Sequence, residues 1–203
     1  MIVDDAIARE LCIATSRCTG LEYVVVFDMF TGEVIGQRSG EPDSAGFSLA
    51  VREAALDSQR KLKVVHSHPQ DKALSLSPVD LIVLWDYEGI YEIEAVTLDG
   101  SWFLARAGAH SRELSKAYVG RAFNDLYKIC LNVKGHDPLS SAEARYLDEA
   151  STDLCCRALA KRGTITYECG LSRRLEIAWN PHSKLRDELV RLTVARSRIP
   201  QRY

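Results

Sequence analysis

The sequence lacks any run of about 18 apolar residues, the length that a membrane-spanning helix needs, so we expect no membrane span. It also lacks a recognisable secretion signal. Residues 1–16 carry Asp4, Asp5, Arg9 and Glu10, whereas a signal has a charged start followed by an apolar run. A large net charge is missing too, because 26 basic and 28 acidic residues give −2 at pH 7. This balance argues against nucleic acid as a partner.

Paired cysteines are also missing. The six cysteines form no C-x-x-C pair, and the adjacent Cys155 and Cys156 are poor partners for a disulfide with each other. Without a secretion signal, we expect mostly buried, reduced thiols in a cytoplasmic protein.

What the sequence does contain is enough apolar material for a globular core, at 46% of 203 residues. Periodicity and turn residues predict strands at 22–28, 33–38, 62–66, 90–98 and 101–107. They predict helices at 2–16, 48–61, 111–131 and 140–162, with others starting at 77 and at 180, and a short hairpin within 163–179. The fold class is therefore α/β of the α+β type. We expect an α/β module over 1–108 and a mainly helical extension over 109–203.

The chemically informative segment runs from His66-Ser67-His68-Pro69 to Ser77-Pro78-Val79-Asp80. Residues i and i+2 of a strand point the same way, so His66 and His68 can present both imidazoles to one point. Ser77 is a good N-cap, Pro78 suits the first helical position, and Asp80 then lies in the first turn. The pattern predicts that this carboxylate faces the strand end.

Two neutral imidazoles and one carboxylate, with a fourth position left for water, are typical of a catalytic zinc site, so we expect one Zn²⁺ per chain. The alternative interpretation is that these are ordinary strand-end histidines followed by a simple helix cap. With five histidines in the chain, an H-x-H pair alone arises by chance in roughly one such sequence in eight. His110, His136 and His182 have no ligand partner at a helical or strand spacing, and we expect surface or core roles for them.

The combined pattern resembles the signature of JAB/MPN (JAMM) metalloproteases, in which seven residues separate H-x-H from S-x-x-D. Here eight residues, 69–76, lie between His68 and Ser77. The extra residue lies in a loop, where insertions are tolerated, but it leaves Ser75 as a neighbouring alternative to Ser77. The resemblance covers about 1–108 and fits bacterial or phage-type JAB domains. It implies a cytidine-deaminase-like mixed sheet flanked by helices.

The resemblance also implies a glutamate on an early strand. Glu22 opens the first strand, 44 residues before His66, and would be the general acid/base, with Glu33 and Glu41 as competing candidates. The ligands His66, His68 and Asp80 would hold a zinc ion that lowers the pKa of its water. Ser77 would stabilise the oxyanion by about 3–4 kcal/mol, or would serve only as the helix cap.

The function implied is hydrolysis of an amide bond by a zinc peptidase or isopeptidase. Its substrate would be a protein or peptide, such as the C-terminus of a ubiquitin-like protein. The alternatives are a RadC-like DNA-associated protein and a non-catalytic MPN binding module. The extension over 109–203 could hold a substrate tail, form a dimer or dock on a partner. Its stripe of Leu185, Leu189 and Leu192 is expected to be core packing.

Overall fold

The computed structural model describes residues 1–41, 46–69, 74–136 and 140–196. Its strands are β1 (Tyr23–Asp28), β2 (Val34–Ser39), β3 (Leu62–His68), β4 (Ile90–Thr97), β5 (Trp102–Ala107) and β6 (Ile165–Gly170). Its helices are α1 (Asp5–Thr19), α2 (Leu49–Ala55), α3 (Pro78–Asp86), α4 (Arg112–His136), α5 (Ser141–Lys161), α6 (Arg173–Trp179) and α7 (Ser183–Arg196), with a short 3₁₀ turn η1 (Asn180–His182). No helix within these described ranges is long and apolar enough to cross a membrane.

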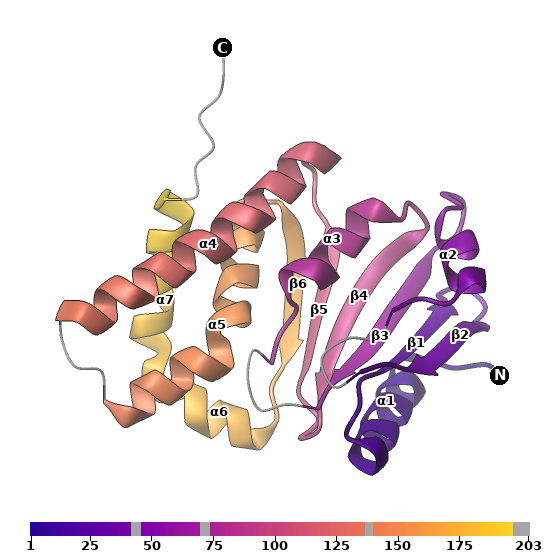
Figure 1. Ribbon diagram of the computed structural model, residues 1–203, viewed down its shortest axis with the longest axis horizontal. Coiled ribbons are helices and arrows are strands. Elements are labelled where there is room, and N and C mark those ends of the chain that lie inside the picture. Colours follow the sequence, from indigo (N-terminus) through magenta and orange to yellow (C-terminus); the bar gives the residue numbers. More distant parts are fainter. Residues whose placement is uncertain (42–45, 70–73, 137–139, 197–203) are drawn as a thin grey trace.

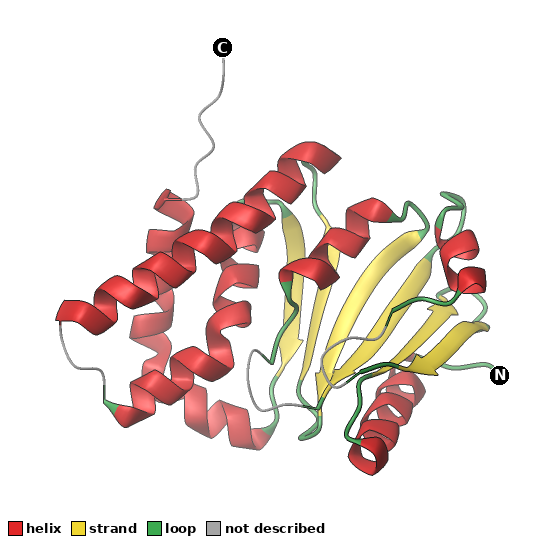
Figure 2. Ribbon diagram, in the orientation of Figure 1, coloured by secondary structure: helices red, strands yellow, loops and turns green. Residues whose placement is uncertain are grey.

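The six strands form one mixed sheet in the order β2-β1-β3-β4-β5-β6 (Figure 1). Only the central neighbours β3 and β4 run parallel, and the remaining pairs are antiparallel. Figure 2 shows the sheet in yellow with helices around it. The expected α+β class, with a mixed sheet flanked by helices, is confirmed.

The two faces of the sheet bury different helices. Alternate residues of β3, such as Val64, pack in a cluster with residues of α2, α3, α4 and α5. The residues between them, such as Val65, pack against α1 on the opposite face. Because side chains alternate along a strand, His66 and His68 lie on the same face as Val64, the face covered by α2, α3, α4 and α5.

The helices α4 to α7 gather beside β6 and form a second apolar cluster with Leu74 and Phe103 of the sheet region (Figure 1). The stripe of Leu185, Leu189 and Leu192 lies in this cluster, so the expected core packing is confirmed. The sheet itself continues past the expected boundary at residue 108, because β6 pairs with β5 along its whole length. The division into two domains stays a prediction.

The prediction of a hairpin within 163–179 is wrong for its second strand. β6 is its only strand, and it pairs with β5 rather than with a following strand. The segment Leu-Glu-Ile-Ala-Trp lies in the helix α6, whose N-cap Ser172 accepts a hydrogen bond from the Leu175 N–H. Leu175 and Trp179, four residues apart, are both buried, while Ile177 between them is 66% exposed. That is a helical spacing, since a strand would place all three on one face.

The helix expected over 48–61 ends early, at Ala55. The Ala55 carbonyl accepts a hydrogen bond from the Gly89 N–H at 2.8 Å, which ties the end of α2 to the turn before β4. The cysteines are all free, and Cys12, Cys155 and Cys156 are buried while Cys18 is exposed.

Candidate metal centre

The two histidines come from the end of β3, which remains a regular strand through His68. Both side chains point to the face of the sheet that carries α3. Ser67, between them, points to the other face, where its hydroxyl contacts Ser16 of α1 and accepts a hydrogen bond from the Tyr23 N–H at 2.8 Å. The strand therefore offers two imidazoles on one side and is fixed to its neighbours on the other.

Asp80 is positioned by the start of α3. Ser77 caps the helix through its hydroxyl, which accepts from the Asp80 N–H at 3.3 Å. In return, the Ser77 N–H donates to Oδ2 of Asp80 at 2.7 Å. This reciprocal capping box, with Pro78 in the first turn, is what the sequence predicted. It fixes the Asp80 carboxylate and leaves Oδ1 directed at His66.

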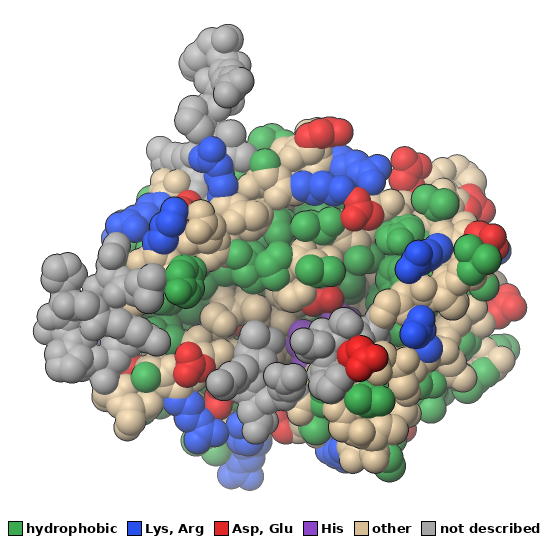
Figure 3. Space-filling model, in the orientation of Figure 1, with side chains coloured by type: hydrophobic (Ala, Val, Ile, Leu, Met, Phe, Trp, Pro, Cys, Tyr) green, Lys and Arg blue, Asp and Glu red, His purple; other side chains and the backbone are tan. Residues whose placement is uncertain are grey.

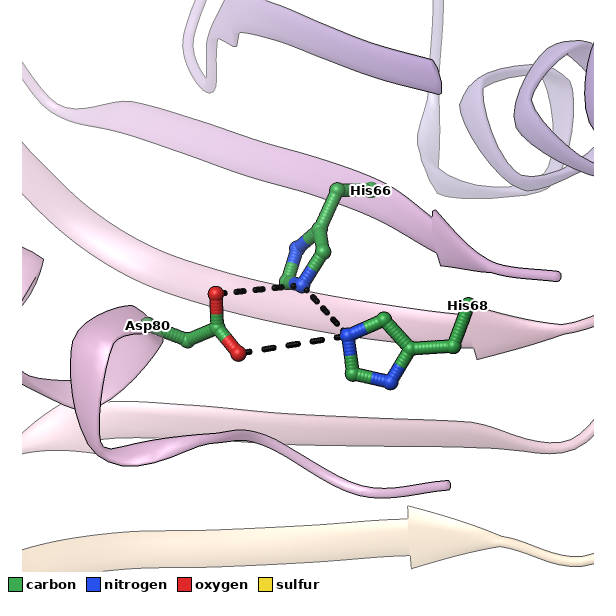
Figure 4. A group of neighbouring side chains, drawn as sticks. All are labelled: His66, His68 and Asp80. Atoms are coloured by element: carbon green, nitrogen blue, oxygen red, sulfur yellow. Dashed lines mark hydrogen bonds and ion pairs between the residues drawn. The ribbon is translucent and has the colours of Figure 1, made fainter. Parts of the chain in front are cut away.

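The three side chains converge on one small volume (Figure 4). The Nε2 atoms of His66 and His68 are 3.1 Å apart, and Asp80 Oδ1 lies 3.3 Å from Nε2 of His66. Asp80 Oδ2 lies 3.9 Å from Nε2 of His68. Ligands at about 2.0–2.1 Å from a tetrahedral ion are separated by about 3.3 Å, so this spacing and donor set fit a divalent metal. Within the described residues, no other group of metal-binding side chains is found.

The electrostatics of the group also favour a cation. Burial lowers the pKa of His66, but the carboxylates of Asp80 and Glu22 raise it by more, so that the pKa lies above its usual value. Burial raises the pKa of Asp80, and the facing His66 outweighs this effect and holds the pKa well below its usual range. The carboxylates that attract a proton to the imidazole would equally attract a metal ion.

A second contact orients His68. Its Nδ1 lies 3.2 Å from the carbonyl oxygen of Leu74, which can only accept. Nδ1 therefore carries the proton, and the lone pair of Nε2 is directed toward Asp80. Histidine ligands of metals commonly have such a partner on the nitrogen away from the ion.

Glu22 lies beside this group. In the antiparallel register of β1 and β3, Val24 faces His66, and continuing the register places Glu22 opposite His68. Its side chain is buried, and Oε1 lies 3.8 Å from Nε2 of His68. The side chains of the two competing acids are exposed. Glu33 lies near the other end of β1, where its backbone carbonyl accepts from the Asp28 N–H. The backbone carbonyl of Glu41 accepts from the Glu22 N–H.

The two serines of the motif have different surroundings. Ser75 is fully buried, and its hydroxyl contacts Tyr167 at 2.7 Å. Ser77 is partly exposed beside Asp80. Of the two, Ser77 is the one placed next to the candidate metal group.

A pocket of about 340 Å³ adjoins His68. Its lining residues are His68, Pro69, Leu74, Thr97, Leu98, Asp99 and Arg174. Arg174 belongs to α6 and donates from Nε to Asp99 at 2.7 Å. Figure 3 shows histidine atoms in a hollow on the face drawn there. Arg174 was not predicted from the sequence, because it lies in the segment that we expected to be a hairpin.

The isolated histidines have other partners. His110 contacts the Arg162 carbonyl at 2.8 Å, and His182 stacks on Tyr146 with ring centroids 4.8 Å apart. His136 has no described side chain. Neither His110 nor His182 joins the metal-binding group, as expected.

No protein-family model, no curated protein and no solved structure matches this chain. The function of the protein is therefore inferred from the geometry of the site and from the motif.

Proposed function

We propose that the protein is a zinc-dependent hydrolase of amide bonds, acting on a protein or peptide in the manner of JAMM peptidases. One observation carries the proposal. Nε2 of His66, Nε2 of His68 and the Asp80 carboxylate meet within 4.8 Å, and a buried Glu22 carboxylate lies 3.8 Å from one of these ligands. Three ligands without cysteine leave a coordination position open, which favours a catalytic rather than a structural ion.

Two imidazoles and a carboxylate with an open position can hold zinc, which when bound would supply a Lewis acid that polarises a carbonyl and activates water. The chain's own residues do the rest. Glu22 would take a proton from the attacking water and deliver it to the departing amine. Its burial keeps the carboxylate close to the ligands and away from competing solvent.

The pocket beside His68 would receive the substrate chain next to the bond that is cut. Its aliphatic walls, Pro69, Leu74 and Leu98, suit an extended peptide, and Arg174 with Asp99 supplies polar groups at one side. A ubiquitin-like C-terminus is the substrate class that the motif favours. A RadC-like DNA-associated role or a non-catalytic binding role would leave the buried acid Glu22 beside the ligands without a use.

Metal content and cleavage test the proposal directly. Protein loaded in excess zinc and freed of loosely bound metal is expected to hold about one zinc per chain, measured by mass spectrometry of the metal. It should cleave a reporter joined through an amide bond to the C-terminus of a ubiquitin-like protein, and a chelator should stop the cleavage. Protein that holds no metal would end the proposal. Metal without cleavage of any peptide or fusion would favour a binding module.

Ser77 can be tested separately from its role as a cap. Glycine at an N-cap costs only a few tenths of a kcal/mol relative to serine, but it removes the hydroxyl. If that hydroxyl stabilises the oxyanion, Ser77→Gly should lower kcat by about 10²–10³-fold. Ser77→Thr, which keeps both the cap and the donor, is the matched control. Unchanged kcat in Ser77→Gly would leave Ser77 as a cap alone.

A further inference from the structure

The short segment Leu74–Ser77 carries two supports of the candidate metal centre. The Leu74 carbonyl accepts the hydrogen bond that orients His68. Three residues later, Ser77 begins α3 and fixes the carboxylate of Asp80. A shift of this segment would therefore move one ligand and reorient another.

The backbone of this segment is held by one face of α5. The Leu74 N–H donates to the Glu149 carbonyl at 3.3 Å, and the Ser75 N–H donates to the Thr152 hydroxyl at 3.0 Å. The Cys156 thiol contacts the Leu76 carbonyl at 3.7 Å. Positions 149, 152 and 156 are three and four residues apart, so they lie on the same side of the helix.

The side chain of Ser75 is held by a buried hydrogen-bonded chain. The Tyr167 hydroxyl of β6 donates to Asp153 at 2.8 Å, so its oxygen accepts from the Ser75 hydroxyl at 2.7 Å. Asp153 is anchored in turn by Arg157, whose Nε donates to it at 2.7 Å. Ser75 and Asp153 are both 0% exposed. A buried network in which each group has a partner fixes its members in one arrangement.

We propose that Tyr167 and Asp153 are positioning residues for the metal ligands, and that α5 and β6 hold segment Leu74–Ser77 in the geometry that the centre needs. The inference rests on the proposed function, because it assumes that His66, His68 and Asp80 bind zinc. The extension over 109–203 then helps to position the proposed ligands. It holds Leu74, whose carbonyl orients His68, and Ser77, which fixes the Asp80 carboxylate.

Tyr167→Phe tests the proposal because it deletes one hydroxyl and keeps the ring. Ser75 and Asp153 then each lose a partner, and the Ser75 hydroxyl keeps only its longer contact with the Cys156 thiol at 3.8 Å. We expect zinc affinity to fall about 10-fold, the lower end of the effect of outer contacts on metal sites. The measurement is competition for zinc with a coloured chelator, which needs no substrate. With zinc in excess, kcat should fall while KM stays near the wild-type value.

Tyr146→Phe is the matched control. Tyr146 is a buried tyrosine of this region, on α5, whereas Tyr167 is partly buried. Within the described residues the Tyr146 hydroxyl has no hydrogen-bond partner. Its ring contacts Trp179 and His182, and its hydroxyl takes no part in the hydrogen bonds that hold segment Leu74–Ser77. Its zinc affinity should equal that of the wild type, even if its thermal stability changes.

The outcomes separate the two proposals. Wild-type protein that binds no zinc defeats the proposed function and this inference with it. Wild-type protein that binds zinc, together with a Tyr167→Phe variant of equal affinity and lower stability, defeats the inference alone and makes the network purely structural. If Tyr167→Phe does not fold, Ser75→Ala decides in its place, since it removes the same hydrogen bond and leaves the Tyr167–Asp153 contact in place.

Discussion

Replacing Glu22 with glutamine is expected to lower kcat by about 10²–10⁴-fold while about one zinc stays bound. Glutamine has nearly the same shape as glutamate, but its amide does not accept a proton at neutral pH. Because Glu22 Oε1 lies 3.8 Å from a ligand nitrogen and no ligand role is needed for it, the metal should remain. Metal analysis and initial rates on the same preparation measure both quantities.

Glu41→Gln is the control for this result. Glu41 was a competing candidate for the acid, it is exposed, and its backbone carbonyl accepts a hydrogen bond from the Glu22 N–H. Its kcat should match that of the wild type. A fully active Glu22→Gln variant would show that another group moves the proton, and a slow Glu41→Gln variant would point to Glu41.

Replacing His68 with alanine should abolish stoichiometric zinc binding and, with it, all cleavage. It removes one of the three proposed ligands and leaves His66 and Asp80, too few protein ligands for a catalytic zinc site. A ligand that binds only the native state raises the melting temperature, so zinc should raise Tm for the wild type and leave the variant unchanged.

His182→Ala provides the comparison, because it also deletes one imidazole but at a site stacked on Tyr146. It should keep its metal and its zinc-dependent rise in Tm. Retention of a full zinc complement by His68→Ala would mean that the ligand set is wrong.

The candidate metal-binding group of the site was predictable because its determinants are local. The alternation of a strand puts His66 and His68 on one side, and the sequence from Ser77 to Asp80 specifies its own helix cap. Each of these features spans only a few residues, so no knowledge of the tertiary fold is needed. The prediction for Glu22 depended on resemblance, since its position opposite His68 requires the pairing of β1 with β3.

The supporting parts of the site were not predictable, for a physical reason. Ser75 and Tyr167 are 92 residues apart in sequence, and Arg174 is 75 residues from Asp99. Such contacts follow from tertiary packing and leave no local pattern. The wrong strand in 163–179 has a related cause, because a short apolar run fits both a strand and a helix until its packing partners are known.

The pairing of β6 with β5 has a practical consequence for anyone who wishes to study the zinc motif in a smaller protein. A chain truncated after residue 108 would keep every proposed ligand, yet it would remove β6 and leave one edge of Trp102–Ala107 unpaired, while the other edge still pairs with β4. Unprotected strand edges recruit other molecules and aggregate. Failure of such a fragment would therefore report on its solubility and would carry no information about its chemistry.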